Sequence, residues 1–115
     1  DLAGSTKTST GLYYRDVSVG SGSLVSSGQQ LGMRYTLWLP NGTQVESNAN
    51  GAPYAVRIGT GAVIAGWDQG IPGMKVGGVR QLIIPPALGY GAAGSPPAIG
   101  ANAILVFSVQ VVSAQ

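Results

Sequence analysis

The sequence of 115 residues contains neither cysteine nor histidine. The lack of cysteine excludes disulfides, a thiol nucleophile and thiolate metal sites. The lack of histidine removes the usual general base, the commonest zinc ligand and any Ser-His-Asp triad. The acidic residues number only four, and their spacing does not suggest a carboxylate pair for hydrolysis: Asp1, Asp16, Glu46 and Asp68. We therefore expect a protein without a cofactor and without a metal site.

Charged residues of both signs are few, at 9% of the chain against about 25% in an average domain. The six basic residues are scattered, whereas a nucleic-acid interface needs them clustered on one face. No apolar run approaches the ~20 residues of a membrane span. A surface of uncharged polar residues favours an extracytoplasmic protein, periplasmic or secreted, with the cytoplasm as the alternative. Since the sequence begins at Asp1 rather than Met, we expect a processed form from which any signal peptide is already removed.

Glycine, in contrast, is abundant, with 19 residues. Gly59-Thr60-Gly61 resembles part of a dinucleotide-binding fingerprint, but the third glycine and the surrounding βαβ unit are missing. No Walker-type lysine and serine pair follows a glycine-rich loop either. The glycines are therefore interpreted as turn residues that tolerate positive φ.

Alternating apolar and polar residues predict strands, and glycine and proline mark where they end. The clearest example contains Met33, Tyr35 and Leu37, and the turn Asn41-Gly42 that follows is a strong hairpin signal. Strands are expected at 12–17, 31–39, 44–47, 54–58, 79–84 and 103–112. A short helix is expected at 63–70 and a long loop at 87–102. Residues 1–10 are expected to form a flexible N-terminal arm ahead of one domain at 11–115.

The expected order of elements also predicts the fold class. The long crossovers of βαβ units are missing, so the sheet should be antiparallel. One short helix and the apolar face of the sheet must then cover each other. The sequence therefore predicts an α+β protein, in which a curved antiparallel sheet of five or six strands wraps around one short α-helix.

Two aromatic residues lie where an apolar pocket could be built. Trp67 follows Gly66 on the expected helix, and a large ring beside glycine can form the floor of a pocket as well as fill a core. Tyr90 lies between Gly89 and Gly91 in a loop, where a ring has little reason to be buried. A concave apolar site with a few polar groups is the usual form of a ligand-binding pocket. Core packing is the alternative for each of these rings.

The stretch from Val63 to Gly91 carries a specific family resemblance. Its first part reads VIAGWDQGIPGMKVGG over residues 63–78, and Ile84-Pro85-Pro86 and Leu88-Gly89-Tyr90-Gly91 follow at the family's spacing. Together these motifs resemble the FKBP (tacrolimus-binding) family of peptidyl-prolyl cis-trans isomerases. Similar segments upstream and downstream extend the match to about residues 11–112, nearly the whole chain.

The resemblance implies isomerisation of X-Pro bonds in protein substrates by a non-covalent apolar pocket. Trp67 would be the floor under the proline ring, while the Ile64 backbone N–H and the Tyr90 hydroxyl would each donate to a substrate carbonyl. The implied catalytic residues are Tyr35, Glu46, Ile64, Trp67 and Tyr90. The implied substrate-binding residues are Val45, Tyr54, Val63, Ile99 and Phe107. The implied partners are proline-containing polypeptides and immunosuppressive macrolides, and we expect a monomer that binds no nucleic acid and has no membrane span.

Three departures from the family pattern are visible, and one is Ser95, which stands where the family commonly has an aromatic residue or histidine in the loop. Val45-Glu46 replaces a Phe-Asp pair after the hairpin, which thins one wall of the pocket and lengthens the carboxylate beside it. Ile99-Gly100-Ala101 replaces Ile-Pro-Pro before the last strand, which predicts a more mobile loop. These changes leave an alternative open, an FKBP-fold chaperone or binding module with little isomerase activity. A second alternative is an unrelated β-rich secreted adhesion domain.

Overall fold

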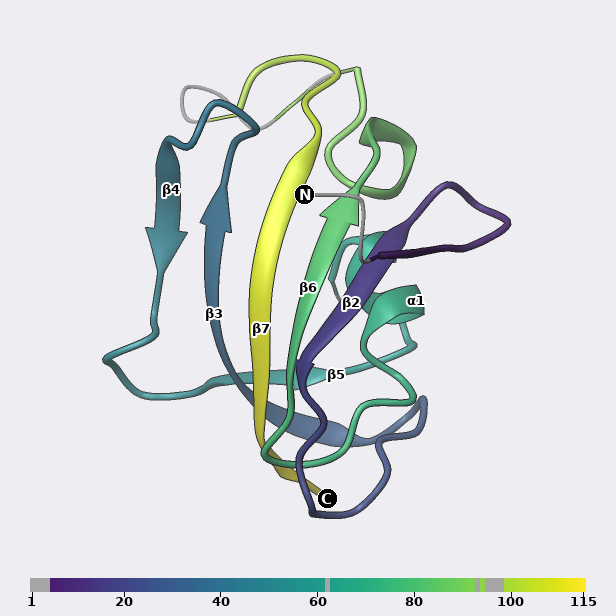
Figure 1. Ribbon diagram of the computed structural model, residues 1–115, viewed down its shortest axis with the longest axis vertical. Coiled ribbons are helices and arrows are strands. Elements are labelled where there is room, and N and C mark those ends of the chain that lie inside the picture. Colours follow the sequence, from purple (N-terminus) through teal and green to yellow (C-terminus); the bar gives the residue numbers. More distant parts are fainter. Residues whose placement is uncertain (1–4, 62, 93, 95–98) are drawn as a thin grey trace.

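The computed structural model describes residues 5–61, 63–92, 94 and 99–115. These residues form a seven-stranded sheet and one α-helix (Figure 1). The strands are β1 (Thr6–Lys7), β2 (Tyr13–Ser18), β3 (Gln30–Trp38), β4 (Gln44–Ser47), β5 (Tyr54–Arg57), β6 (Val79–Ile84) and β7 (Leu105–Ala114). The helix is α1 (Ala65–Gly70), and a 3₁₀ turn, η1, covers Pro86–Leu88. No helix in the described part of the chain is both long and apolar enough to cross a membrane.

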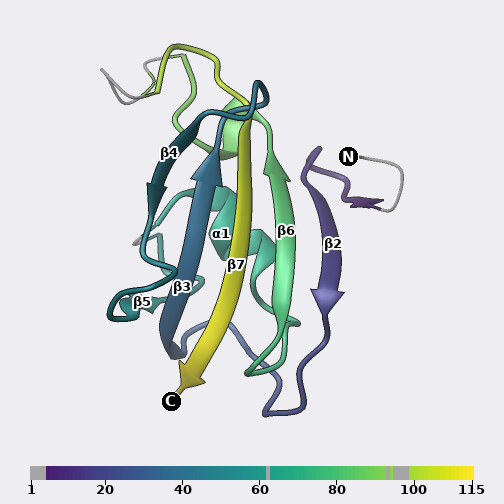
Figure 2. The same ribbon diagram turned by 60° about the vertical axis from the view of Figure 1, so that its left-hand side comes forward.

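The sheet is antiparallel throughout, and its order is β1-β2-β6-β7-β3-β4. The long strand β3 has two partners on one side, because β5 pairs with its first half and β4 with its second half. Strand β7 pairs along the other side of β3 and occupies the middle of the sheet in Figure 1. Figure 2 shows α1 behind the sheet, on one of its two faces. The strands next to α1 are therefore positioned to build a site together with it.

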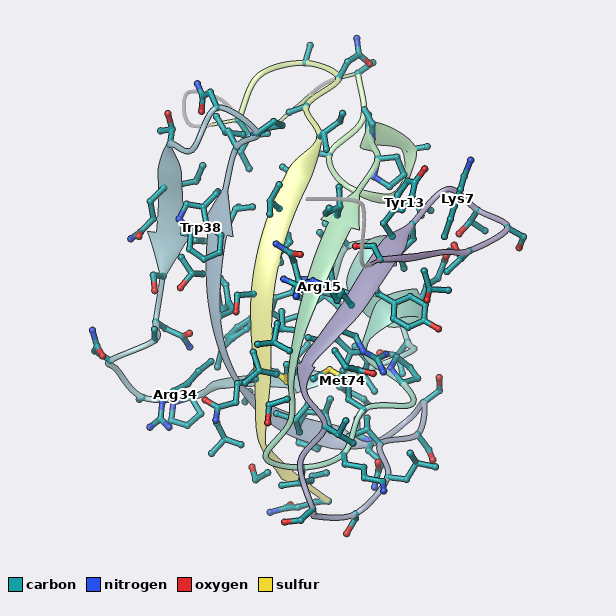
Figure 3. The ribbon with its side chains drawn as sticks, in the orientation of Figure 1. Lys7, Tyr13, Arg15, Arg34, Trp38 and Met74 are labelled. Carbon is teal, nitrogen blue, oxygen red and sulfur yellow. The ribbon has the colours of Figure 1, made fainter. Side chains whose placement is uncertain are left out.

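The face of the sheet toward α1 forms the core, because buried apolar residues alternate with more exposed ones along the central strands. In β7 every second residue from Leu105 to Val111 is buried, and in β6 Leu82 and Ile84 are fully buried. The same alternation in β3 places Arg34 and Trp38, which are labelled in Figure 3, on the opposite face. The two faces of the sheet thus differ in character, and only one of them is apolar enough for a core.

Helix α1 approaches β6 closely because its inner face is made of glycine. Gly66 and Gly70 are four residues apart and therefore share one face of the helix. A Cβ at Gly66 would come within 2.6 Å of the Ile84 side chain, and one at Gly70 within 2.8 Å of the Leu82 side chain. The two glycines let the short helix rest directly on β6, which sets the depth at which Trp67 lies.

Arg80 joins the helix to the sheet through polar contacts. From β6, its Nε donates to Asp16 Oδ1 of β2 at 2.7 Å, and its Nη1 donates to the Gly70 carbonyl at 2.9 Å. Its guanidinium also lies over the Tyr14 ring, 4.7 Å from the centroid. A charge that is only 8% exposed must be paired and hydrogen-bonded to be tolerated, and these contacts meet that requirement. Arg80 therefore fixes the C-terminal end of α1.

The predicted fold class is confirmed, and every predicted strand is present within two residues of its expected bounds. Helix α1 begins at Ala65 rather than residue 63, because Ile64 still has an extended backbone with ψ of 149°. Strand β7 begins two residues later than predicted, after Asn102 with its positive φ of 57°. Strand β1 pairs with β2 inside the predicted arm, so Thr6 and Lys7 belong to the sheet rather than to a free segment. The turn η1 likewise adds a helical element at the start of the predicted long loop. The part of that loop at 93 and 95–98, with Ser95, lies outside the described residues.

Candidate functional site

An apolar pocket of about 370 Å³ lies between α1 and the sheet. Volumes of roughly 300–1,000 Å³ are typical of small-molecule sites. The residues that line it come from β3, β5, β7, α1 and two loops: Tyr35, Tyr54, Val63, Ile64, Trp67, Tyr90 and Phe107. All seven are among the site residues that the sequence predicts, so the structure brings together positions that are up to 72 residues apart.

Trp67 lies at the base of this pocket, between two aromatic rings that the sheet provides. Its side chain is only 3% exposed. The ring centroids of Tyr35 and Phe107 lie 5.2 Å and 5.4 Å from that of Trp67, at interplanar angles of 82° and 76°. Such edge-to-face contacts are a favoured geometry for aromatic pairs. Tyr54, with its centroid 6.4 Å from that of Trp67, extends the aromatic wall to the exposed mouth.

The indole Nε1 of Trp67 is buried and has no hydrogen-bond partner among the described residues. A buried unpaired donor is rare in folded proteins and costs free energy that the surrounding structure must supply. The indole ring is therefore held by packing contacts rather than by a hydrogen bond from Nε1. The base of the pocket consequently presents aromatic surface rather than a fixed polar group.

Asn48 supports Tyr35 from outside the pocket. Its Oδ1 accepts the Tyr35 N–H at 2.7 Å, and its Nδ2 donates to the Met33 carbonyl at 3.0 Å and to the Ala52 carbonyl at 3.2 Å. These contacts fall where β3 passes from one partner, β5, to the other, β4. The asparagine amide thus replaces a neighbouring strand for two residues of β3 and holds the backbone of a pocket residue.

Glu46 places a negative charge beside the tyrosine hydroxyls. Burial raises the pKa of Tyr35 to about 12, and the charge of Glu46 and its hydrogen bond with the Tyr35 side chain add to the rise. Burial, followed by the charge of Glu46, also raises the pKa of Tyr90. Both hydroxyls therefore stay protonated at neutral pH. Tyr90, which lines the pocket and is 38% exposed, presents its hydroxyl where a ligand can reach it.

A β-bulge in β4 explains how Val45 and Glu46 can serve the same side of the sheet. Leu37 pairs with Glu46 and Trp38 pairs with Gln44, so Val45 is an extra residue in the register. Neighbours in a regular strand face opposite sides, but a bulge redirects them. Here Val45 packs against the core cluster while Glu46 reaches Tyr35.

Ile64 presents a free backbone donor next to the pocket. Its carbonyl accepts the N–H groups of Trp67 at 3.0 Å and Asp68 at 3.3 Å, which starts the first turn of α1. Its own N–H donates to no described residue, as expected for a residue at a helix N-terminus. With its side chain in the pocket wall, Ile64 can supply both apolar contact and a hydrogen-bond donor.

Not every predicted site residue lies in the pocket. Val45 is half-buried against the core, and Ile99 is 4% exposed within the core cluster; neither lines the pocket that the described residues form. Glu46 acts from the rim and is exposed. Sequence reasoning misses Asn48 and Asp68, which hold the backbone around the pocket. An acidic residue directly after Trp67 was the only available signal, and it does not specify a partner.

The fold and the pocket agree with what comparison to known proteins finds. A family model described as FKBP-type peptidyl-prolyl cis-trans isomerase matches residues 22–112. The solved structure of AtFKBP13 is similar with a TM-score of 0.90 and 36% identity, over 96% of this chain and 98% of that chain. The structure of FkpA from Escherichia coli is similar with a TM-score of 0.88 and 34% identity, over 98% of this chain and 52% of that chain.

Two curated relatives carry the name FK506-binding protein 4. The protein from Rhizopus delemar is 47% identical over 108 residues, which are 94% of this chain and 28% of that protein. The protein from Dictyostelium discoideum is 47% identical over 104 residues, which are 90% of this chain and 28% of that protein. The chain thus spans little more than a quarter of the length of these relatives.

Proposed function

The chain belongs to the FKBP-type peptidyl-prolyl cis-trans isomerase family, and we propose that it catalyses the isomerisation of X-Pro peptide bonds in polypeptide substrates. The observation that carries the proposal is the apolar pocket with Trp67 at its base and, at its wall, the N–H of Ile64, which donates to no described residue. The aromatic base offers a flat surface for a proline ring. The donor offers a fixed point for a carbonyl of the same substrate.

The reaction suits a site that has no general base. Rotation about an X-Pro bond faces a barrier of about 18–20 kcal/mol and takes tens to hundreds of seconds without a catalyst. The barrier arises from amide resonance, so no covalent intermediate and no proton transfer to a side chain is required. The twisted amide is less dipolar than the planar one. An apolar pocket therefore stabilises the twisted state relative to the ground state and lowers the barrier.

The residues at the pocket divide this work between them. Trp67 and Phe107 enclose the proline ring, which excludes water from the reacting amide. The Ile64 N–H and the Tyr90 hydroxyl hold substrate carbonyls on either side of the bond, so that the chain can rotate about a fixed axis. The negative charge of Glu46 helps to raise the pKa of Tyr35, so that this hydroxyl stays protonated at the rim of the pocket. Orientation and desolvation together account for the catalysis.

Macrolides such as tacrolimus would occupy the same pocket. The family binds proline-containing substrates and FK506. We propose that this chain binds proline-containing substrates and macrolides as a monomer, since one copy supplies all seven residues that line the pocket.

An isomerisation assay with a Leu-Pro tetrapeptide tests the proposal. The unaltered chain should accelerate cis-trans exchange, and Tyr90→Phe should lower kcat/KM about fivefold, because one hydrogen bond of about 1 kcal/mol is lost. Trp38→Phe, on the opposite face of the sheet, is the matched aromatic control and should leave kcat/KM unchanged. Folded protein that binds tacrolimus but does not accelerate exchange would instead identify a binding module.

A further inference from the structure

Asp68 makes two backbone contacts that close the segment in front of α1. It follows Trp67 in the helix, and its two carboxylate oxygens accept separate N–H groups. Oδ1 accepts the N–H of Gly59 at 2.7 Å, and Oδ2 accepts the N–H of Gly61 at 2.9 Å. Hydrogen bonds to an ionised acceptor are stronger than those between neutral groups. One carboxylate thus holds two points of the turn that follows β5.

The glycines are what allow both N–H groups to converge on one side chain. Gly59 and Gly61 have φ of +82° and +79°, in the left-handed region that other residues seldom adopt. A Cβ at Gly59 would also lie 2.6 Å from that of Ser27. The turn is therefore pressed against the residues before β3 on one side and bound to Asp68 on the other.

The contacts of Asp68 enclose the residues that line one wall of the pocket. Its carboxylate binds the turn at Gly59 and Gly61, while its own N–H donates to the Ile64 carbonyl at 3.3 Å. Val63 and Ile64 lie between these two anchor points along the chain, and both line the pocket. The direction of the free Ile64 N–H consequently depends on how the turn and the helix are joined.

We propose that Asp68 is a positioning residue for the isomerase, which holds Ile64 so that its N–H points to the substrate carbonyl. The inference rests on the proposed function, because it concerns the donor that the reaction uses. Asp68 does not line the pocket and touches no substrate. Its removal should release the turn and let the donor rotate away, while the aromatic base at Trp67, held by its own ring contacts, remains in place.

The chain offers a matched control on the same helix. Gln69 is the next residue, and its Oε1 accepts a hydrogen bond from Thr10 Oγ1 at 2.7 Å, on the side of the N-terminal segment. Gln69→Ala removes a helix-to-loop contact without touching the turn at 59–61. Asp68→Ala removes both contacts to that turn. Asp68→Asn keeps the shape and one acceptor oxygen, but it turns an amide N–H toward the second donor.

The experiment measures amide hydrogen exchange by residue, together with kcat/KM for a Leu-Pro tetrapeptide, at a temperature where each variant is folded. In the unaltered chain, saturating tacrolimus should slow exchange at Ile64, because its N–H then has an acceptor. We expect Asp68→Ala to speed exchange at Gly59 and Gly61, to abolish the ligand protection at Ile64 and to lower kcat/KM about tenfold. Asp68→Asn should lower kcat/KM by a smaller factor. Gln69→Ala should change neither the exchange at Gly59 and Gly61, nor the ligand protection at Ile64, nor kcat/KM.

Several results would overturn the proposal. One is a faster exchange at Gly59 and Gly61 with unchanged protection at Ile64 and unchanged kcat/KM, which would make Asp68 a loop anchor only. Another is a loss of kcat/KM and of Ile64 protection in Gln69→Ala that equals the loss in Asp68→Ala. If both Asp68 variants are unfolded at 15 °C, Asp68 is a folding determinant and the positioning role falls. Lack of isomerase activity in the unaltered chain would refute the proposed function instead, and exchange at Ile64 would still decide the role of Asp68.

Discussion

Asn48 shows how a residue outside the pocket determines one inside it. Its amide binds the backbone of β3 at Met33 and at Tyr35, on the edge where pairing with β5 ends and pairing with β4 begins. The hydroxyl of Tyr35 can meet Glu46 only if that backbone is held. The Asn48 side chain therefore contributes both to the stability of the fold and to the position of Tyr35 in the pocket.

Replacement of Asn48 by alanine should therefore lower stability. The change leaves the Tyr35 N–H and the Met33 carbonyl without their partners, at a cost of about 2 kcal/mol. Chemical unfolding measures this loss in the free energy of unfolding, with Asn41→Ala as the control. Among the described residues the Asn41 side chain makes one hydrogen bond, in which its Oδ1 accepts the Thr43 N–H in an exposed turn, so its loss should cost about 0.5 kcal/mol. Equal losses of unfolding free energy in Asn48→Ala and Asn41→Ala would show that water replaces the amide contacts of Asn48.

A second prediction concerns the Tyr35 hydroxyl. Glu46→Gln removes the negative charge that helps to raise the Tyr35 pKa to about 12, so the pKa should fall, while burial keeps it above 10. NMR of labelled tyrosine rings at pH 11 should show Tyr35 protonated in the unaltered chain and more ionised in the variant. In the folded chain Tyr35 holds its proton above the unfolded value of 10, so the stability linked to it is present below pH 10 and is lost between pH 10 and about 12. An unchanged Tyr35 titration in the variant would mean that the carboxylate does not reach the hydroxyl.

The sequence reveals the pocket residues at this scale but not their supports. Trp67 and Tyr90 stand out because rings beside glycine are unusual, and the family motif adds the other five lining residues. Asn48 and Asp68 act on backbone atoms, and many polar residues can do so wherever the chain brings them. Their partners are therefore visible only once the turns are placed.

At the scale of elements, the packing of α1 depends on two glycines rather than on an apolar stripe. Gly66 and Gly70 face β6, and the helix has only six residues, too few to be stable without tertiary contacts. Close approach to the sheet supplies those contacts. The cost is that glycine weakens the helix itself by about 1 kcal/mol per residue.

Gly66→Ala tests whether close approach outweighs helix propensity. The new Cβ would meet three atoms of the Ile84 side chain at 2.6–2.8 Å, so β6 or α1 must shift. Overpacking costs about 1–3 kcal/mol, and the gain in helix propensity returns about 1 kcal/mol. We expect a net loss of about 1 kcal/mol in the free energy of unfolding and a lower kcat/KM, because Trp67 is displaced with the helix.

The control for this change is Gly100→Ala, where a Cβ would meet no atom of the described residues within 4 Å. That variant should keep both its stability and its activity. The double change Gly66→Ala/Ile84→Ala removes the atoms that clash and should restore part of the activity, although it loses core volume. A Gly66→Ala protein more stable than the unaltered chain would show that helix propensity dominates at this position.

Strand positions were more predictable than their register. Alternation defines β3 and β6 well, because one face of each is buried. The β-bulge at Val45 is not visible in the alternation, since the residue is apolar and its neighbours are polar. As a result, the sequence cannot say that Val45 packs on the core while Glu46 reaches Tyr35. A bulge is a property of the pairing, which needs both strands.

At the scale of the whole molecule, the short and scattered strands predict the antiparallel α+β class, and the family motif predicts the site. The order of strands is not contained in either observation. β2 pairs with β6 and β7 lies between β6 and β3, so neighbours in the sheet are often distant in the sequence. Local patterns describe the elements, whereas burial of the common core decides how they are arranged. The edge strand β1 is only two residues long, which is too short for any periodic signal.

The last prediction follows from the absence of histidine in the whole chain and from the state of the pocket hydroxyls. An enzyme that works by general acid–base catalysis needs a group that titrates near the working pH. This chain has no histidine, and the pKa values of Tyr35 and Tyr90 are both raised above their ordinary value of 10. If desolvation and orientation lower the barrier, kcat/KM for a Leu-Pro tetrapeptide without titrating side chains should stay nearly constant from pH 6 to 8. Tyr90→Phe should lower the rate by the same factor at every pH in that range, because the hydroxyl donates a hydrogen bond and does not transfer its proton. A bell-shaped profile, or an effect of Tyr90→Phe that changes with pH, would require a proton-transfer step and would contradict the mechanism.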